Sequence, residues 1–475
     1  MNSKRFIIFL LCGLFTVSLI ADKTAFSKAF QLYNQGEFSE LKQFADSIKK
    51  TDTNNPYLHR FDSLCEIASR IRLDFNLSEP KAEAQIRTKI GAFTLKNKKQ
   101  WESKGWLEYR MIDGQKRYFN RSVSNLKLRL NQYNDSANNR MPPLDSLSAF
   151  RLRHTAQAIA QTAQPGDLSV PVNFTLTYTL SVKPDVVPAG ETIRCWLPYP
   201  KENRSRQSNV KLIDASPKSY RIAPDSTGHR SIYMERKTVA GKSTEFKLRV
   251  SYRGAAQYFD LNKAKIKAYK KKSTLYQQYT EQQGTHIVFT PQIKALADQI
   301  TGKEKQPFKI VQLLYEWIDS HIIWSGALEY STMENIPQYV LDNRRGDCGM
   351  QTLLFMTMAR YKGIPVKWQS GWMLHLGEVN LHDWCEVYYE GPGWVPLDMS
   401  FGLQRSAHPA VRDFYMSGMD AYRLIVNDEI SAQFVPQKQF LRSETVDFQR
   451  GEVEWKGGNL YFDKWDYHMD VDYKP

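Results

Sequence analysis

The 475-residue chain has few cysteines, and their spacing excludes a disulfide-rich or zinc-finger protein. Only four of the five lie beyond the first 21 residues, which is too few for a disulfide framework in a chain of this length. No cysteines and histidines are spaced as zinc ligands, and no segment has the acidic pattern of an EF-hand loop. The sequence therefore implies no metal and no other cofactor.

Repeats, low-complexity tracts and long apolar runs are also missing. The content of 42% hydrophobic and 13% aromatic residues is enough for buried cores, and the length favours roughly two to four domains. Apart from residues 6–20, no apolar run approaches the roughly 20 residues that a membrane-spanning helix needs.

The N-terminus has the pattern of a secretory signal. Lys4 and Arg5 precede the apolar run, and the small residue Ala21 follows it. We expect residues 1–21 to be a cleaved signal peptide and the mature chain to be exported to the periplasm or the cell surface. An uncleaved anchor is the alternative.

The net charge is +15, with a pI near 9.3. Such a charge favours association with anionic polysaccharide, lipid headgroups or nucleic acid, although solubility alone also explains it. The densest basic run, residues 261–273, lacks the interleaved aromatic residues on which bases could stack. We therefore expect no nucleic-acid partner.

Hydrophobic periodicity divides the chain into regions of different structure. Residues 22–163 are predicted to be mainly helical, with a β-hairpin near 106–120 where Asp113-Gly114 separates two alternating runs. Short alternating runs with turn signals between them predict an antiparallel β-sandwich-like domain over 168–256.

The region that carries the chemistry is expected at 290–425. A helical connector rich in lysine and tyrosine, 257–289, leads into it, and a C-terminal β extension, 426–475, follows it. Two helices with prolines in their first turn are predicted at its start, at Pro291 and Pro307. The second has one continuous apolar stripe, which indicates packing rather than chemistry.

Cys348 is the first candidate catalytic residue. Asp347 is a good N-cap, so a helix is predicted from Cys348 to a stop at Gly363. In the first turn of a helix, the dipole and the free N–H groups favour a thiolate and can stabilise an oxyanion. A buried structural cysteine is the alternative, but residues 344–347 are typical of a loop rather than of a core.

His382 and Asp398 supply a candidate base and the group that orients it. His382 opens a predicted strand, residues 391–393 turn the chain, and Asp398 lies on the returning strand. Their even separation of 16 allows both to share one face of the sheet. However, a tight turn centred on Pro392 would set them about four residues out of register, roughly 13 Å along the strands. The turn must then be off-centre, or the strands must contain a bulge.

This stretch resembles the transglutaminase-like superfamily, a papain-like group of Cys-His-Asp enzymes. The resemblance covers about 100–130 residues and rests on an ordered set of motifs. These are Gly-Asp-Cys at 346–348, Ala-Arg at 359–360, Gly-Ile-Pro at 363–365, Gly371, His-x-Trp-x-Glu-Val at 382–387, and Gly-x-Trp-x-x-x-Asp at 391–398 with one extra residue in its turn. By that resemblance Cys348 is the nucleophile, His382 the base and Asp398 the orienting group. The sequence W-L-P-Y-P at 196–200 resembles the β domain found before this core in bacterial relatives.

The sequence departs from the family pattern at three places. Val366-Lys367 replaces the usual Ala-Arg after Gly-Ile-Pro, and Met399-Ser400 replaces Pro-Thr after the aspartate. Asp383 stands where a small residue often separates the histidine from the tryptophan, and it adds a second carboxylate near the base. Because all three triad positions are kept, we expect catalysis, with the substrate preference left open.

Tryptophans are dense around the candidate triad. They could line a groove for an extended polymer or peptide, although core packing is an equal alternative for each of them. The groove candidates are Trp324, Trp372, Trp384 and Trp394. Cys385 points to the face opposite His382 by strand alternation, so we expect it in the core rather than in a disulfide with Cys348.

The predicted fold is α+β, with a papain-like transglutaminase-like core preceded by an antiparallel β-sandwich domain and a mainly helical N-terminal region. The predicted function is that of an exported thiol enzyme that acts on amide or peptide carbonyls through a thioester. Hydrolysis is favoured over cross-linking to an amine, because the closed tunnel that would shield a thioester from water is not evident. Expected substrates are a protein, a peptide or a cell-envelope polymer. The alternative is a non-enzymatic module that keeps the fold and binds a surface polymer or a protein.

Overall fold

The computed structural model describes residues 25–53, 55, 57–137 and 143–474. The segment expected to be a signal peptide, residues 1–21, lies outside them. The described chain divides into two compact units, and each draws on segments that are distant in sequence. The first unit comprises Met1–Pro142, Gln283–Val288 and Ser325–Asn343; the second comprises Pro143–Gln282, Phe289–Trp324 and Arg344–Pro475.

The first unit is mainly helical and contains a small antiparallel sheet. Its helices are α1 (Ala25–Gln35), α2 (Phe38–Thr51), α3 (Leu58–Asp74), α4 (Glu79–Lys89), α5 (Leu95–Ser103), α6 (Ser122–Ala137), the short η2 (Tyr330–Thr332) and α11 (Ile336–Asn343). Its strands pair in the order β1-β3-β2 and are β1 (Leu77–Ser78), β2 (Tyr109–Ile112) and β3 (Gln115–Tyr118).

Asp113 and Gly114 form the two-residue turn between β2 and β3. Their φ angles are 48° and 71°, and both central residues of a type I′ turn need positive φ. The Asp113 carboxylate also accepts hydrogen bonds from the amide and the hydroxyl of Ser39, each at 2.9 Å, and pairs with Arg72. These contacts fix the turn to the start of α2, through Ser39, and to the end of α3, through Arg72.

The second unit contains a sandwich of two antiparallel sheets. One pairs in the order β15-β9-β4-β19 with β6 beside β9, and the other in the order β18-β17-β5-β8-β7. Along β4, Phe174, Leu176, Tyr178 and Leu180 are buried at every second position, as a half-buried strand requires. The strands are β4 (Leu168–Val182), β5 (Thr192–Pro198), β6 (Gln207–Ser216), β7 (Tyr220–Ile222), β8 (Ser231–Lys237), β9 (Thr244–Tyr258), β15 (Gly418–Met419), β17 (Glu452–Trp455), β18 (Gly458–Asn459) and β19 (Trp465–Lys474).

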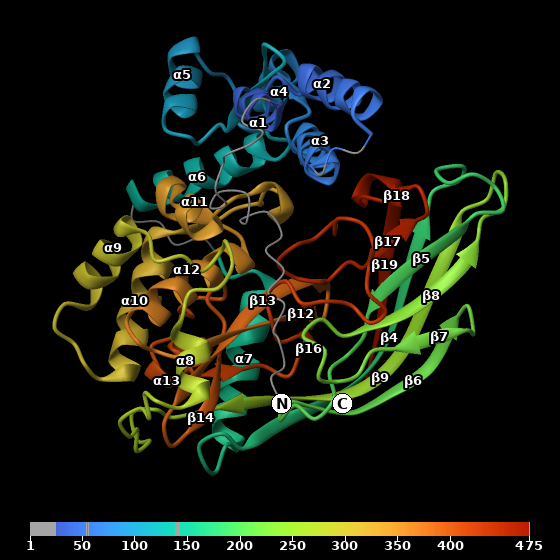
Figure 1. Cartoon of the computed structure of the whole chain (residues 1–475). Helices are drawn as coiled ribbons and strands as arrows, with labels where there is room; N and C mark the ends of the chain where they lie inside the picture. The colour runs from blue at the N-terminus through green and yellow to red at the C-terminus, as the bar shows by residue number, and fades with distance from the viewer. Residues whose placement is uncertain (1–24, 54, 56, 138–142, 475) are drawn as a thin grey trace. The chain divides into compact units, whose positions relative to one another are not determined.

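The C-terminal segment completes this sandwich rather than extending from the end of the chain. In Figure 1 the red strands β17 and β19 lie among the green strands of the N-terminal half of the unit. β17 pairs with β5, and β19 pairs with β4 from Trp465↔Val182 to Lys474↔Asn173. The sandwich therefore needs both 168–256 and the C-terminal residues, because β4 would otherwise expose one unpaired edge.

Two further segments differ from the sequence expectation. The segment 257–289, expected as a helical connector, contains one short helix, α8 (Thr274–Thr280), and is otherwise irregular. The helix α7 (Ser146–Gln161) belongs to the second unit rather than to the N-terminal helical region, because it packs on β4 and β9 and buries Ala158 in the sandwich core.

The candidate catalytic residues lie around a four-stranded antiparallel sheet of the order β14-β13-β12-β16. Figure 1 shows α9, α10 and α12 beside this sheet, and α12 contacts both β12 and β13. The strands are β12 (Val366–His375), β13 (Glu378–Tyr389), β14 (Gly393–Leu397) and β16 (Arg423–Asn427). The helices and the short elements of this part are α9 (Pro291–Thr301), α10 (Pro307–His321), α12 (Cys348–Tyr361), α13 (Pro409–Arg412), η3 (Phe414–Met416), β10 (Ile323–Trp324) and β11 (Arg345–Gly346). The short η4 (Phe462–Lys464) contacts β19 of the sandwich.

The sheet and the sandwich share one hydrophobic core. Trp372 of β12 and Leu424 of β16 are buried in the same cluster as Phe174 and Tyr178 of β4. The rings of Tyr178 and Trp372 stack with centroids 5.0 Å apart. Within the described residues, no helix is both long enough and apolar enough to span a bilayer.

The pairing of β19 predicts a stability effect. Trp465 is 2% exposed and packs in the sandwich core at the start of β19. We expect Trp465→Ala to lower the free energy of unfolding by about 3–5 kcal/mol, the usual cost of truncating a large buried aromatic side chain. Equilibrium unfolding in urea measures this, with His468→Ala, an exposed position on the same strand, as the matched control. A loss below about 1 kcal/mol would show that β19 is not part of the cooperative core.

Candidate active site

Cys348 is the first residue of α12. Asp347 has the extended backbone of an N-cap, and its Oδ1 accepts the amide of Met350 at 3.1 Å. The short parallel pair of β10 and β11 fixes the chain just before this cap, and Gln351 donates to the carbonyl of Gly346 at 3.0 Å. The thiol is thus held at the N-terminal end of a helix that is almost entirely buried, while Cys348 itself is half-buried.

His382 and Asp398 meet because the turn between β13 and β14 is off-centre. The pairing runs from Cys385↔Leu397 to Tyr389↔Gly393, which leaves three residues, 390–392, in the loop. Asp398 then lies diagonally from His382, two residues out of register instead of four, or about 7 Å along the strands. The side chains bridge that offset, since His382 Nε2 lies 2.7 Å from Asp398 Oδ2.

Asp398 is fully buried, and several donors hold its charge. Its Oδ2 also accepts Arg423 Nη2 at 2.9 Å, and its Oδ1 accepts the amides of Ser400 and Phe401 at 3.1 and 3.2 Å. Burial alone would raise the pKa of this carboxyl, but His382, Arg423 and the hydrogen bonds together lower the pKa below its usual value. Asp398 is therefore an ionised acceptor at neutral pH.

His382 is kept in its neutral form. Burial lowers the pKa of the imidazole, and the nearby Arg423 adds to that effect, while Asp398 opposes it. Because Asp398 takes Nε2, the remaining ring nitrogen is Nδ1. That nitrogen is available to exchange a proton.

The thiol of Cys348 is hydrogen-bonded to a different carboxyl group. Its Sγ lies 3.4 Å from Asp383 Oδ2, and no hydrogen bond joins the thiol to His382 in the described structure. Burial raises the pKa of the Cys348 thiol well above its usual value, and the carboxyl groups of Asp383 and Asp347 raise it further. In this conformation Cys348 is a protonated thiol, despite its place at a helix N-terminus.

Asp383 is itself one of a pair of buried acids. Its Oδ1 accepts Gln449 Nε2 at 2.7 Å, and the same amide group bonds the carbonyl of His382 at 2.8 Å. Burial raises the pKa of both Asp383 and Asp447 well above the usual value, and the two carboxyl groups act on each other. The pair therefore retains a proton at neutral pH, because two adjacent buried carboxylates would repel.

The structure places only some of the predicted groove tryptophans at a surface. Trp324 is 53% exposed, and Trp394 is partly buried with Lys367 lying 4.5 Å over its ring. Trp372 and Trp384 are corrections to the groove set, because both are fully buried and cannot present a ring to a substrate. Their indole N–H groups donate to Gln449 O and to Gln369 Oε1, so each is a satisfied core residue.

All four described cysteines are free, and Cys385 is fully buried with its Sγ 3.7 Å from the carbonyl of Leu397. The expected core position of Cys385, without a disulfide to Cys348, agrees with this arrangement.

Sequence reasoning missed the residues that surround the pair of His382 and Asp398. Arg423 bonds Asp398 and lies 3.1 Å from Asp420, and Asp420 in turn lies 3.3 Å from His375 Nε2. The one sequence feature that could have predicted this network is the three-residue spacing of Asp420 and Arg423, which allows an ion pair. The same spacing is common in surface turns, so it does not indicate a site. Gln449 and Asp447 come from still further along the chain, where no motif marks them.

The acidic pair predicts how stability depends on pH. A carboxyl group whose pKa is raised by folding stabilises the fold below its unfolded pKa of about 4, and this contribution is lost as the pH rises through the folded pKa. We expect the melting temperature to fall as the pH rises above the unfolded pKa of about 4, and to fall less in Asp447→Asn, which has one acid fewer to ionise. Asp472→Asn, an exposed change on β19, should keep the wild-type slope. Equal slopes in all three proteins would contradict the shared proton.

Comparison with known proteins identifies one part of the chain. Residues 294–399 match the Transglutaminase-like superfamily, which confirms the resemblance seen in the sequence. The matched segment contains Cys348, His382 and Asp398. It occupies the mixed helix and strand region of the second unit and supports a thiol-dependent class of enzyme in general terms.

More distant similarities extend over larger parts of the chain. The uncharacterised protein YebA of Bacillus subtilis is 20% identical over 179 residues, which cover 34% of this chain and 24% of YebA. The chain thus spans about a quarter of the length of that relative. A candidate cysteine protease from Cytophaga hutchinsonii is 13% identical with a TM-score of 0.43, over 65% of this chain and 92% of that one. The periplasmic domain of TgpA from Pseudomonas aeruginosa is 14% identical with a TM-score of 0.26, over 53% of this chain and 91% of that one.

Proposed function

We propose that this chain is an exported thiol hydrolase that cleaves amide or peptide bonds through a thioester on Cys348. The observation that carries the proposal is the 2.7 Å pair of His382 and Asp398 within the same family-matched segment as a cysteine at a helix N-terminus. The basic and apolar pattern of residues 1–21 supports export.

The proposed reaction moves one proton between the thiol, the imidazole and the leaving amine. Cys348 Sγ attacks the carbonyl carbon and gives its proton to His382 Nδ1, while Asp398 holds Nε2. The C–N bond then breaks, the amine takes the proton from His382, and the acyl group remains as a thioester. Water, deprotonated by His382, cleaves the C–S bond and restores the thiol.

The start of α12 supplies donors for the oxyanion of the tetrahedral intermediate. The first amides of a helix have no partner within the helix, and the side chain of Asp347 accepts the amide of Met350. The amides of Cys348 and Gly349 are the donors that we assign to the oxyanion.

Asp383 holds the thiol in a resting state in this proposal. Before attack, the Cys348 thiol must exchange its hydrogen bond to Asp383 for one to His382 Nδ1. Activation therefore requires a rotation of the cysteine side chain. A substrate carbonyl bound at the first turn of α12 would favour that rotation, because it places the developing negative charge away from Asp383 and Asp447.

Water is the favoured acyl acceptor. Cys348 is half-buried, so solvent reaches the thioester site, whereas transfer to an amine needs protection from water. The proposed substrates are protein, peptide or cell-envelope polymer chains, and the exposed Trp324 in β10 remains a candidate contact for them.

Acylation by an activated ester tests the proposal without knowledge of the natural substrate. We expect p-nitrophenyl acetate to give a burst of nitrophenol and one acetyl group on Cys348 by peptide mass mapping. His382→Ala should slow acylation by about 10²–10⁴-fold, the usual range for loss of a general base. Hydrolysis should then outpace transfer to added glycine ethyl ester.

The matched control is Cys65→Ser, which alters a partly exposed cysteine of the first unit and should leave the burst unchanged. Acetylation that occurs equally on Cys65 and Cys348, or that is insensitive to His382→Ala, would refute an activated nucleophile. That result would favour a non-enzymatic module that binds a surface polymer or a protein. Predominant transfer to the amine would keep the thiol mechanism and replace hydrolysis by cross-linking.

A further inference from the structure

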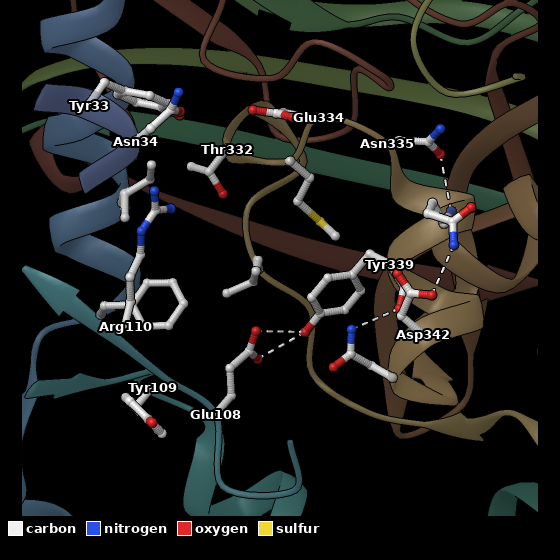
Figure 2. A pocket seen from close by; sticks show the side chains of 16 residues that line it. Tyr33, Asn34, Glu108, Tyr109, Arg110, Thr332, Glu334, Asn335, Tyr339 and Asp342 are labelled. Carbon is white, nitrogen blue, oxygen red and sulfur yellow. Dashed lines mark hydrogen bonds between the residues drawn. The ribbon is translucent and has the colours of Figure 1, made fainter. Parts of the chain in front are cut away.

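The first unit contains a polar cleft that the proposed reaction does not use. It has a volume of about 470 Å³, which lies in the usual range for small-molecule sites. Figure 2 shows that its walls come from α1, from β2 and from the segment 325–343, which all belong to the first unit.

Arg110 of β2 provides a positive charge on one wall. Its guanidinium lies against two rings, 5.5 Å from the centroid of Phe38 and 5.9 Å from that of Tyr33. Among the described residues it has no carboxylate within ion-pair distance and no hydrogen-bond acceptor. Arg72, which lies over the same Phe38 ring, is by contrast paired with Asp113. Arg110 is therefore held in place by packing, with its donors directed to no other described group.

Glu334, from the segment 325–343, provides a negative charge at the same cleft. It is exposed, and it forms neither an ion pair nor a hydrogen bond with any residue that the structure describes. Both charges act on the Tyr33 phenol. Burial raises the pKa of Tyr33 to about 12, Arg110 lowers it and Glu334 raises it. Figure 2 shows Arg110, Tyr33 and Glu334 around the same space.

The other acids of the cleft are used to build its walls. Tyr339 donates to both oxygens of Glu108 at 2.9 Å, and Gln338 donates to Asp342 at 2.9 Å. The hydrogen bonds from Tyr339 and Gln338 hold Glu108 and Asp342 in the walls. Arg110 and Glu334 are the guanidinium and the carboxylate of the cleft whose side chains have no hydrogen bond or ion pair among the described residues. A guanidinium prefers a carboxylate, and a carboxylate prefers an ammonium group.

We propose that this cleft binds the ammonium and carboxylate groups of an amino acid or a short peptide, the carboxylate at Arg110 and the ammonium at Glu334. The rings of Tyr33 and Tyr109 would contact the body of the ligand. This site is separate from the Cys348 chemistry, and the proposal does not depend on the proposed function.

Calorimetric titration of the full mature chain tests this site, with Cys348→Ser present so that no ligand is consumed. The probe is the dipeptide alanyl-alanine, compared with its N-acetyl and its C-amide forms. We expect the dipeptide to bind and each capped form to bind about tenfold more weakly, because each loses one charge-assisted contact. Arg110→Gln and Glu334→Gln should weaken binding of the dipeptide by a similar factor.

The matched controls are Arg117→Gln and Glu40→Gln. Arg117 pairs with Arg110 across the hairpin, and Glu40 lies on α2. Neither residue lines the cleft. Both should bind the dipeptide as the parent protein does. If a cleft variant fails to fold, the capped dipeptides still test the two charges on the unaltered cleft. No binding at about 10 mM dipeptide, or equal binding of the free and capped forms, would overturn the proposal.

Discussion

A single buried carboxylate, Asp398, determines the geometry of the candidate site. An ionised carboxylate without exposed surface costs several kcal/mol unless donors surround it. Here His382, Arg423 and two backbone amides supply those donors, and all of them must be in place together. The need to satisfy Asp398 therefore fixes the imidazole, the turn that follows β14 and the start of β16 relative to one another.

The close approach of β16 depends on Gly371, which lies opposite His382 in the pairing of β12 and β13. A Cβ atom at this position would lie 1.9 Å from the carbonyl oxygen of Leu424, so only glycine lets β16 pair with β12 here. Arg423, the first residue of β16, is brought to Asp398 by that pairing. The glycine seen in the family motif thus has a physical role in positioning the charge that supports the base.

Two aspartates near the reacting groups are held in opposite protonation states by their surroundings. Asp398 is surrounded by donors and is ionised, whereas Asp383 is buried beside another acid and retains a proton with Asp447. The first arrangement prepares His382 to accept a proton, and the second opposes the formation of a thiolate at Cys348. The resting thiol is therefore less nucleophilic than its place at a helix N-terminus would make it.

Local sequence patterns predicted the parts of the site that local interactions build. The N-cap at Asp347 and the glycine stop at 363 define α12, and strand alternation places Asp398 on the face of His382. The register could not be predicted, because the three-residue loop 390–392 is one of several that a Gly-Pro-Gly sequence allows.

Sequence patterns could not predict which tryptophans are buried or which distant residues contact the site. Trp372 looks like a groove residue until the sandwich core is seen to cover it, and Trp384 is instead buried against Met419 and Ile425. Gln449 and Asp447 reach Asp383 only because the C-terminal chain returns to complete the sandwich through β17 and β19. Pairings between distant segments depend on tertiary packing, which no local pattern encodes.

Alkylation of Cys348 by iodoacetamide across pH, with site mapping, is the most direct measurement of the central claim that Asp383 holds the thiol protonated. In Asp383→Asn the labelling curve should shift to lower pH by about one unit or more, because the negative charge that Asp383 and Asp447 share beside the thiolate is then removed. His382→Ala, measured in parallel, reports how far the imidazole supports the thiolate in each background. A curve for Asp383→Asn that coincides with the wild type, or that lies at higher pH, would contradict the claim.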